Sequence, residues 1–124
     1  MAEDSIQRET GQAFMPKFDA NGLLSAVVVN AATREILMVA FMDEEAIAAT
    51  QSTGLAHFHS RSRGKLWQKG ESSGNVLKVR EILVDCDQDA LVLMCEPAGP
   101  TCHTGATSCF YRRLEDGALQ PVKT

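Results

Sequence analysis

The chain has 124 residues, of which 12 are Lys or Arg and 16 are Asp or Glu, so its formal net charge is −4, and 44% of its residues are hydrophobic. This length fits one domain, and the apolar content suffices for a core, which excludes a mainly disordered chain. The acidic balance argues against a general nucleic-acid coat protein, because phosphate binding usually requires a basic excess.

The N-terminus gives no indication of export or membrane insertion. Its first five residues are acidic and lack the basic start and apolar core of a signal peptide. The longest apolar runs, Ala26–Val29 and Ile36–Met42, are too short to span a bilayer. We therefore expect a cytoplasmic protein, whose cysteines are metal ligands, catalytic thiols or core residues rather than disulfides.

The first half of the chain is predicted to form a polar arm, two strands and a helix. Residues 1–22 contain several helix breakers, so we expect a weakly structured N-terminal arm. The segments Leu24–Asn30 and Ile36–Phe41 are apolar, and the turn between them is short enough for a β-hairpin. Asp43 is a good N-cap for residues 44–53, which form the one predicted helix.

The second half is predicted to contain strands separated by two loops. The strands are expected at Leu55–Ser60, Val76–Val84, Ala90–Cys95 and Ser108–Leu114. The loops cover 61–75 and 97–105, and residues 114–124 are expected to be a polar C-terminal tail. The pattern predicts a mainly β fold with one α-helix, of the α+β class, with its core domain in residues 23–113.

A basic segment, residues 60–75, contains four cations, four serines, three glycines and the only tryptophan. Arginine and lysine side chains bind phosphate, and glycines let backbone N–H groups approach it. We therefore predict that Arg61, Arg63 and Lys69 bind an anionic substrate, the alternative being a solvated basic loop. Trp67 either stacks on a base or belongs to the core.

Three carboxylates alternate in the acidic segment that follows the strand predicted at Val76–Val84. If that strand continues, Asp85, Asp87 and Asp89 share one face, where their oxygens suit Mg²⁺. An EF-hand loop is excluded because Ala90 stands where such a loop needs glycine. The alternative is an acidic turn that faces solvent.

Thiols and an imidazole cluster in the second loop and just beyond it. Cys102, His103 and Cys109 suit Zn²⁺, although their spacing is not that of a zinc finger. Cys86 is a possible third thiolate, but on a strand it would point away from the neighbouring aspartates. Cys95 lies in an apolar strand and is predicted to be a core thiol. His57 and His59 alternate on a predicted strand, where we expect structural roles.

Taken together, these segments resemble the phosphoribosyl-AMP cyclohydrolase family. The matching stretches are Ser60–Arg63, Leu66–Trp67, Lys69–Glu71, Ser73–Gly74, Asp85–Leu91, Gly99–Gly105 and Ser108–Phe110, with Leu37–Met42 as an early strand. Each motif is weak alone, but their order and combination are specific, and they cover most of residues 23–113. Asn75 departs from the pattern, since family members often carry histidine there.

The resemblance implies hydrolytic opening of the adenine ring of phosphoribosyl-AMP at the N1–C6 bond, in histidine biosynthesis. It also implies a barrel-like, mainly antiparallel fold and an intertwined homodimer, with no nucleic-acid or membrane partner. The implied zinc ligands are Cys86 of one chain with Cys102 and Cys109 of the other, and the implied magnesium ligands are Asp85, Asp87 and Asp89. His103 would transfer protons beside the zinc.

Two other function classes remain open from the residues. A zinc-dependent nucleotide deaminase would also attack a purine C6, but its H-x-E and P-C-x-x-C motifs are absent from the sequence. A noncatalytic, zinc-stabilised nucleotide-binding module would need a closed site, with Cys95 or His103 as its fourth ligand.

Overall fold

The computed structural model describes the backbone of residues 2–122 and the side chains of residues 4–122. Its elements are α1 (Ala2–Thr10), β1 (Leu24–Asn30), β2 (Ile36–Met42), α2 (Glu44–Thr53), β3 (His57–Ser60), β4 (Lys65–Gln68), β5 (Leu77–Val84), β6 (Ala90–Pro97), β7 (Arg112–Glu115) and β8 (Ala118–Pro121). The described residues are therefore mainly β with two helices, which agrees with the predicted α+β class. No helix within the described residues is long and apolar enough to cross a bilayer.

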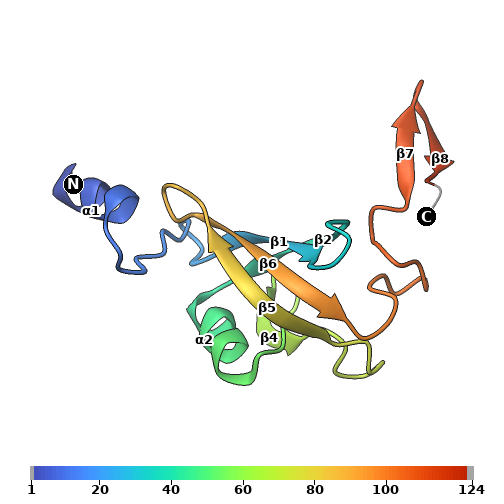
Figure 1. The fold of residues 1–124 in the computed structure, drawn as a ribbon, viewed down its shortest axis with the longest axis horizontal. Coiled ribbons are helices and arrows are strands. Elements are labelled where there is room, and N and C mark those ends of the chain that lie inside the picture. Colours follow the sequence, from blue (N-terminus) through green and yellow to red (C-terminus); the bar gives the residue numbers. More distant parts are fainter. Residues whose placement is uncertain (1, 123–124) are drawn as a thin grey trace.

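A four-stranded sheet in the order β2-β1-β6-β5 forms the centre of the molecule (Figure 1). The β1–β2 and β5–β6 pairs are antiparallel hairpins, whereas β1 and β6 are parallel. The long connection from β2 through α2, β3 and β4 returns the chain to the end of the sheet where β2 begins, so β5 runs in the same direction as β2, and β6 runs parallel to β1. The expected barrel-like antiparallel sheet was wrong, since the sheet is mixed and open.

Helix α2 and the β3–β4 hairpin cover one face of the sheet and enclose the core (Figure 1). Alternate strand residues such as Val28 and Leu93 are fully buried there, as the twofold periodicity of strands requires. Asp43 caps α2 by accepting a hydrogen bond of 2.8 Å from the Ala46 N–H. Gly54 ends α2 in the left-handed region, at φ 77°. The predicted helix 44–53 is thus confirmed with its start and stop signals.

The opposite face of the sheet, which we call the open face, carries an apolar row that α2 does not cover. The strand register aligns one residue from each of the four strands: Val39, Val27, Val92 and Leu83. The outer two, Val39 and Leu83, are 48% and 46% exposed. The open face therefore presents apolar side chains from all four strands to solvent.

The two ends of the chain are more regular than the sequence predicted. The segment Ala2–Thr10 is helical, so the prediction of a single helix was wrong, and good helix formers such as Glu, Gln and Arg explain it. Near the C-terminus, β7 and β8 form a hairpin that projects from the sheet (Figure 1). Asp116 and Gly117, at φ 50° and 78°, make its tight turn, and an Asp-Gly pair is the sequence signal for such a turn.

Candidate active site

The three aspartates converge on a turn rather than on a strand. Strand β5 ends at Val84, and the ligand oxygens of Asp85, Asp87 and Asp89 all lie within 4.8 Å of one another. The Asp85 carboxylate closes this turn by accepting hydrogen bonds from the Asp89 N–H (3.0 Å) and the Ala90 N–H (3.1 Å). The expected continuation of the strand was therefore wrong, and the turn itself gathers the carboxylates. We call this side of the sheet the carboxylate end.

Electrostatics in this turn favour a bound cation. The pKa of Asp89 rises to about 6, because its protonated form donates hydrogen bonds to Asp87 and Asp85 and because their charges repel its own. Partial desolvation acts to raise the pKa of Asp85, but hydrogen bonds, led by the one from the Ala90 N–H, hold it below its ordinary value. A proton on Asp89 thus reduces the repulsion among the three carboxylates. A divalent cation would reduce this repulsion further, so the three carboxylates fit Mg²⁺.

Cys102 and Cys109 lie together in the loop that follows β6. Two backbone hydrogen bonds shape a tight turn around Cys102, its N–H donating to Ala106 O and the Gly105 N–H donating to Cys102 O. The Cys109 N–H donates to Leu37 O at 2.8 Å, which anchors the loop on the start of β2. We call this side of the sheet the thiol end.

The surroundings of Cys102 favour its thiolate, the form that binds metals. Hydrogen bonds from the side chain and backbone of Thr104 lower the pKa of Cys102, and its hydroxyl donates to the Cys102 Sγ at 3.1 Å. Burial raises the pKa of Cys109, and the adjacent Cys102 raises it further. The positive charge of Lys69 acts to lower the pKa of both thiols. Lys69 is therefore close to the thiol pair.

The third predicted thiol lies at the other end of the sheet. Cys86 is exposed on the turn before β6, whereas Cys102 follows the end of β6. The eight residues of this strand span about 26 Å at ~3.3 Å per residue. His103 is exposed beside Cys102 and thus belongs to the thiol end. One chain therefore brings together Cys102, Cys109, His103 and Lys69, but not Cys86.

The predicted basic loop is divided between the two ends of the β3–β4 hairpin. The Arg61 guanidinium lies in its turn, with Cζ 4.2 Å from the centroid of the Phe41 ring. Arg63 is exposed in the same turn. Lys69 follows β4 at the opposite end of the hairpin, near the thiols. The prediction of a single long loop was wrong because Lys65–Gln68 pairs with β3.

Trp67, whose role the sequence left open, packs against the core, and the prediction that Cys95 is a core thiol is confirmed. Trp67 packs against Phe58, with ring centroids 5.3 Å apart and planes tilted by 46°. Cys95 is fully buried, and burial raises its pKa to about 12. His57 is also buried, and its Nδ1 lies 2.8 Å from Leu55 O. His59 Nδ1 lies 3.2 Å from a carboxylate oxygen of Asp43, beside the start of α2.

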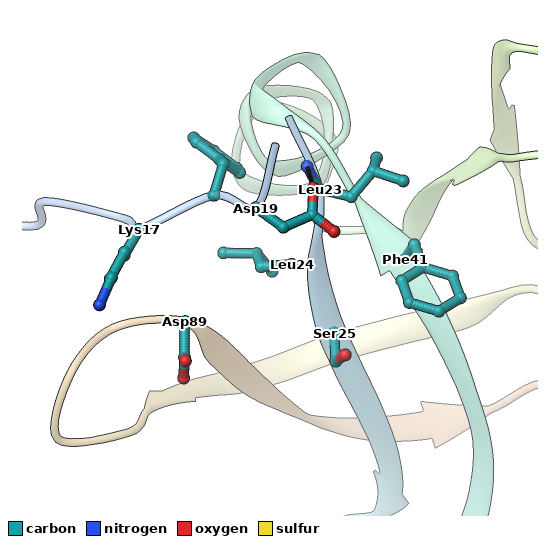
Figure 2. A pocket seen from close by; sticks show the side chains of 8 residues that line it. Lys17, Asp19, Leu23, Leu24, Ser25, Phe41 and Asp89 are labelled. Atoms are coloured by element: carbon teal, nitrogen blue, oxygen red, sulfur yellow. Dashed lines mark hydrogen bonds between the residues drawn. The ribbon is translucent and has the colours of Figure 1, made fainter. Parts of the chain in front are cut away.

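A cavity of about 320 Å³ opens at the carboxylate end, between the sheet and the N-terminal arm (Figure 2). Figure 2 shows Lys17 and Asp89 at one end of this cavity and Phe41 at the other, with Ser25 between them. Lys17 and Asp89 thus line the same space, and the Phe41 ring that lines its other end also contacts the Arg61 guanidinium. Lys17 was missed from the sequence because the arm was expected to lack structure.

Comparison with known proteins identifies the family of this chain. The family profile described as phosphoribosyl-AMP cyclohydrolase matches residues 38–111. The chain belongs to the phosphoribosyl-AMP cyclohydrolase family. It is 63% identical to the phosphoribosyl-AMP cyclohydrolase of Erythrobacter litoralis over 125 aligned residues, covering all of both chains. It is 61% identical to that of Sphingopyxis alaskensis, over 91% of this chain and 90% of the relative. The resemblance predicted from the sequence motifs is confirmed.

Proposed function

We propose that this protein hydrolyses phosphoribosyl-AMP at the N1–C6 bond of its adenine ring, a step of histidine biosynthesis. The relatives of near-full length carry the name phosphoribosyl-AMP cyclohydrolase, which supports this substrate. The observation that carries the proposal is the pairing of Cys102 with Cys109 beside Lys69 and His103, because this group combines metal ligands with a proton carrier.

The proposed zinc ligands are Cys102 and Cys109 of one chain and Cys86 of a second chain. The donor set fits, because Thr104 and Lys69 favour the thiolate of Cys102. Three thiolates leave one of four zinc positions open, and the zinc would supply Lewis-acid activation of water there. A second chain is needed because β6 separates Cys86 from the other two thiols.

Exposed apolar surface supports the proposed homodimer. Every residue of β7 and β8 is exposed, and Leu114 and Leu119 are 73% and 52% exposed. An isolated two-stranded hairpin is marginally stable in water, so these strands need a partner surface. The apolar row on the open face offers such a surface, and a twofold dimer would use each element twice.

His103 and Lys69 have separate proposed roles in the hydrolysis. A water oxygen adds to C6 and the N1–C6 bond breaks, which leaves a carboxamide at C6. One water proton ends on the exocyclic nitrogen of the neutral imine, and the other must reach N1. His103 is exposed beside Cys102 and is the proposed carrier of that proton. The positive charge of Lys69 stabilises negative charge that develops on the attacking oxygen.

The carboxylate end is the proposed phosphate-binding region. Asp85, Asp87 and Asp89 would hold Mg²⁺, which would neutralise phosphate charge when bound. Arg61 and Arg63 in the nearby hairpin turn would bind phosphate oxygens directly. In a dimer with shared thiols, the carboxylate end of one chain meets the thiol end of the other, so the phosphates and the reacting ring occupy one continuous site.

The direct test is to mix the purified protein with phosphoribosyl-AMP and follow the absorbance of the ring-opened product. We expect turnover that stops after treatment with a strong chelator and returns when zinc is added. Release of ammonia without ring opening would instead support a deaminase, and binding without any turnover would support a noncatalytic module. Full activity in verified metal-free protein would refute the zinc mechanism. Folding should be monitored in parallel, because metal removal also affects stability.

A further inference from the structure

Gln88 occupies the centre of the carboxylate turn but faces away from solvent. Its side chain is only 6% exposed, and its backbone is in the left-handed region, at φ 57°. This conformation is unfavourable for a residue with a long side chain, so other interactions must maintain it. Its immediate neighbours on both sides are the proposed ligands Asp87 and Asp89.

The side chain of Gln88 binds the N-terminal arm through three hydrogen bonds. Its Nε2 donates to Arg8 O at 2.8 Å and to Ala13 O at 3.3 Å. Its Oε1 accepts from the Met15 N–H at 2.7 Å. The Gln88 backbone carbonyl adds a fourth contact by accepting from the Lys17 N–H at 2.7 Å. One glutamine thus satisfies four backbone groups of an arm that lies more than 70 residues away in sequence.

The arm is held in this shape by a contact of its own. The Arg8 Nε donates to Met15 O at 2.9 Å, which closes the segment that wraps around Gln88. On one side of the turn this segment lines a crevice of about 340 Å³ together with Asp85 and Cys86. On the other side Lys17 lines the cavity that contains Asp89 (Figure 2). The arm therefore flanks the carboxylate turn on both sides.

We propose that Gln88 is a positioning residue that couples docking of the N-terminal arm to cation binding by the carboxylate turn. The docked arm holds the backbone of Gln88, and this fixes the orientation of the aspartates on either side. Thermodynamic reciprocity then requires that a bound cation stabilises the docked arm to the same extent. This inference rests on the proposed magnesium site, and its test distinguishes failure of the coupling from failure of that site.

The first variant is Gln88→Asn, because asparagine tolerates the left-handed backbone but is one methylene too short to reach the arm. Calorimetric titration with Mg²⁺ should show at least a fivefold loss of affinity relative to wild type, within the usual range of coupling between sites. Gln12→Asn is the matched control, because Gln12 is exposed on the same arm, and its side chain makes none of the hydrogen bonds found among residues 4–122. Its Mg²⁺ affinity should equal that of wild type.

Arg8→Ala tests the coupling from the arm side. The direction of its effect on Mg²⁺ affinity distinguishes positioning of the turn from simple electrostatics. Removal of a positive charge near the acidic turn would by itself strengthen Mg²⁺ binding. Loss of the Arg8 contact to Met15 O loosens the arm, so coupling predicts weaker binding instead. The variant leaves the turn unchanged, and so it remains informative if Gln88→Asn does not fold.

Limited trypsin digestion of the full-length protein provides a readout independent of activity. Mg²⁺ should slow cleavage after Lys17 in wild type and in Gln12→Asn, but not in Gln88→Asn. Asp87→Asn gives the baseline without cation binding. If wild type binds Mg²⁺ and neither Gln88→Asn nor Arg8→Ala weakens that binding, the coupling is overturned but the cation site is not. No Mg²⁺ binding by wild type would overturn the proposed cation site and, with it, the coupling.

Discussion

Subunit complementation is the sharpest test of the proposed shared site. Two sulfur atoms that bind one zinc ion at ~2.3 Å each lie at most about 4.6 Å apart. Cys86 and Cys102 flank opposite ends of β6, which alone spans about 26 Å. No side-chain rotation closes that difference, so a site with both thiols requires two chains. The perturbation is therefore a pair of single variants, Cys86→Ser and Cys102→Ser, each expected to be inactive.

The expected activity of the mixture follows from the twofold arrangement. In a mixed dimer, one site receives both substitutions and the other receives neither. Random pairing makes about half of the dimers mixed, and each has one working site of two, so about a quarter of wild-type activity should return. The assay is turnover of phosphoribosyl-AMP after the two variants are refolded together with zinc.

The matched control combines Cys102→Ser with Cys109→Ser. These two thiols lie together at the thiol end of one chain, so every site in a mixed dimer carries one substitution and no activity should return. If Cys86→Ser and Cys102→Ser give no rescue although mass spectrometry confirms mixed dimers, the shared-site reasoning is refuted. Activity in the control mixture would show that Cys102 and Cys109 do not serve the same site.

Three further predictions address the carboxylate turn, the open face and the loop beside the thiols. Because the pKa of Asp89 is about 6, protons compete with the cation below that pH. Mg²⁺ affinity measured by calorimetry should therefore fall about tenfold per pH unit below 6, and an affinity that stays constant from pH 5 to 8 would contradict this. Val27→Glu places a charge in the centre of the apolar row and should convert a dimer into a folded monomer in sedimentation, whereas a persistent dimer would exclude this face as the interface. Gly70→Ala would place a Cβ against the Asn75 backbone at φ 83° and should lower the free energy of unfolding in urea by more than about 2 kcal/mol. Gly64→Ala, at φ 63° with open space around it, should cost about 1 kcal/mol, and equal losses at the two glycines would contradict the clash.

Local signals explain which parts of the fold could be predicted from the sequence. Helix α2 has its N-cap, apolar face and left-handed stop within twelve residues, and the β1–β2 hairpin has a short turn, so both were recognised. The parallel pairing of β1 with β6 joins residues 65 positions apart, such as Ser25 and Ala90. No local pattern encodes that pairing, and the antiparallel expectation therefore failed at the centre of the sheet.

The candidate site shows the same division between residue chemistry and geometry. The ligand types and the order of their motifs were sufficient to recognise the family. The hydrogen bonds between the arm and Gln88 could not be predicted. In the sequence Gln88 is only a polar residue between two aspartates, and residues 8–17 show no strong hydrophobic periodicity. Only the folded chain shows that this glutamine is buried and bonded to a segment more than 70 residues earlier.

The separation of the two clusters has a consequence for how the enzyme forms. Strand β6 is a stiff spacer that holds the carboxylate end and the thiol end of one chain far apart. Under the proposed arrangement, a lone chain therefore has phosphate-binding residues and metal-binding thiols that cannot act on the same nucleotide. Association would bring Cys86 of one chain to the thiol end of its partner and would bury the apolar row and the exposed β7–β8 hairpin. The same contact that stabilises these surfaces would then assemble the reaction centre, so a substitution that separates the two chains should abolish zinc binding by three thiols and catalysis together.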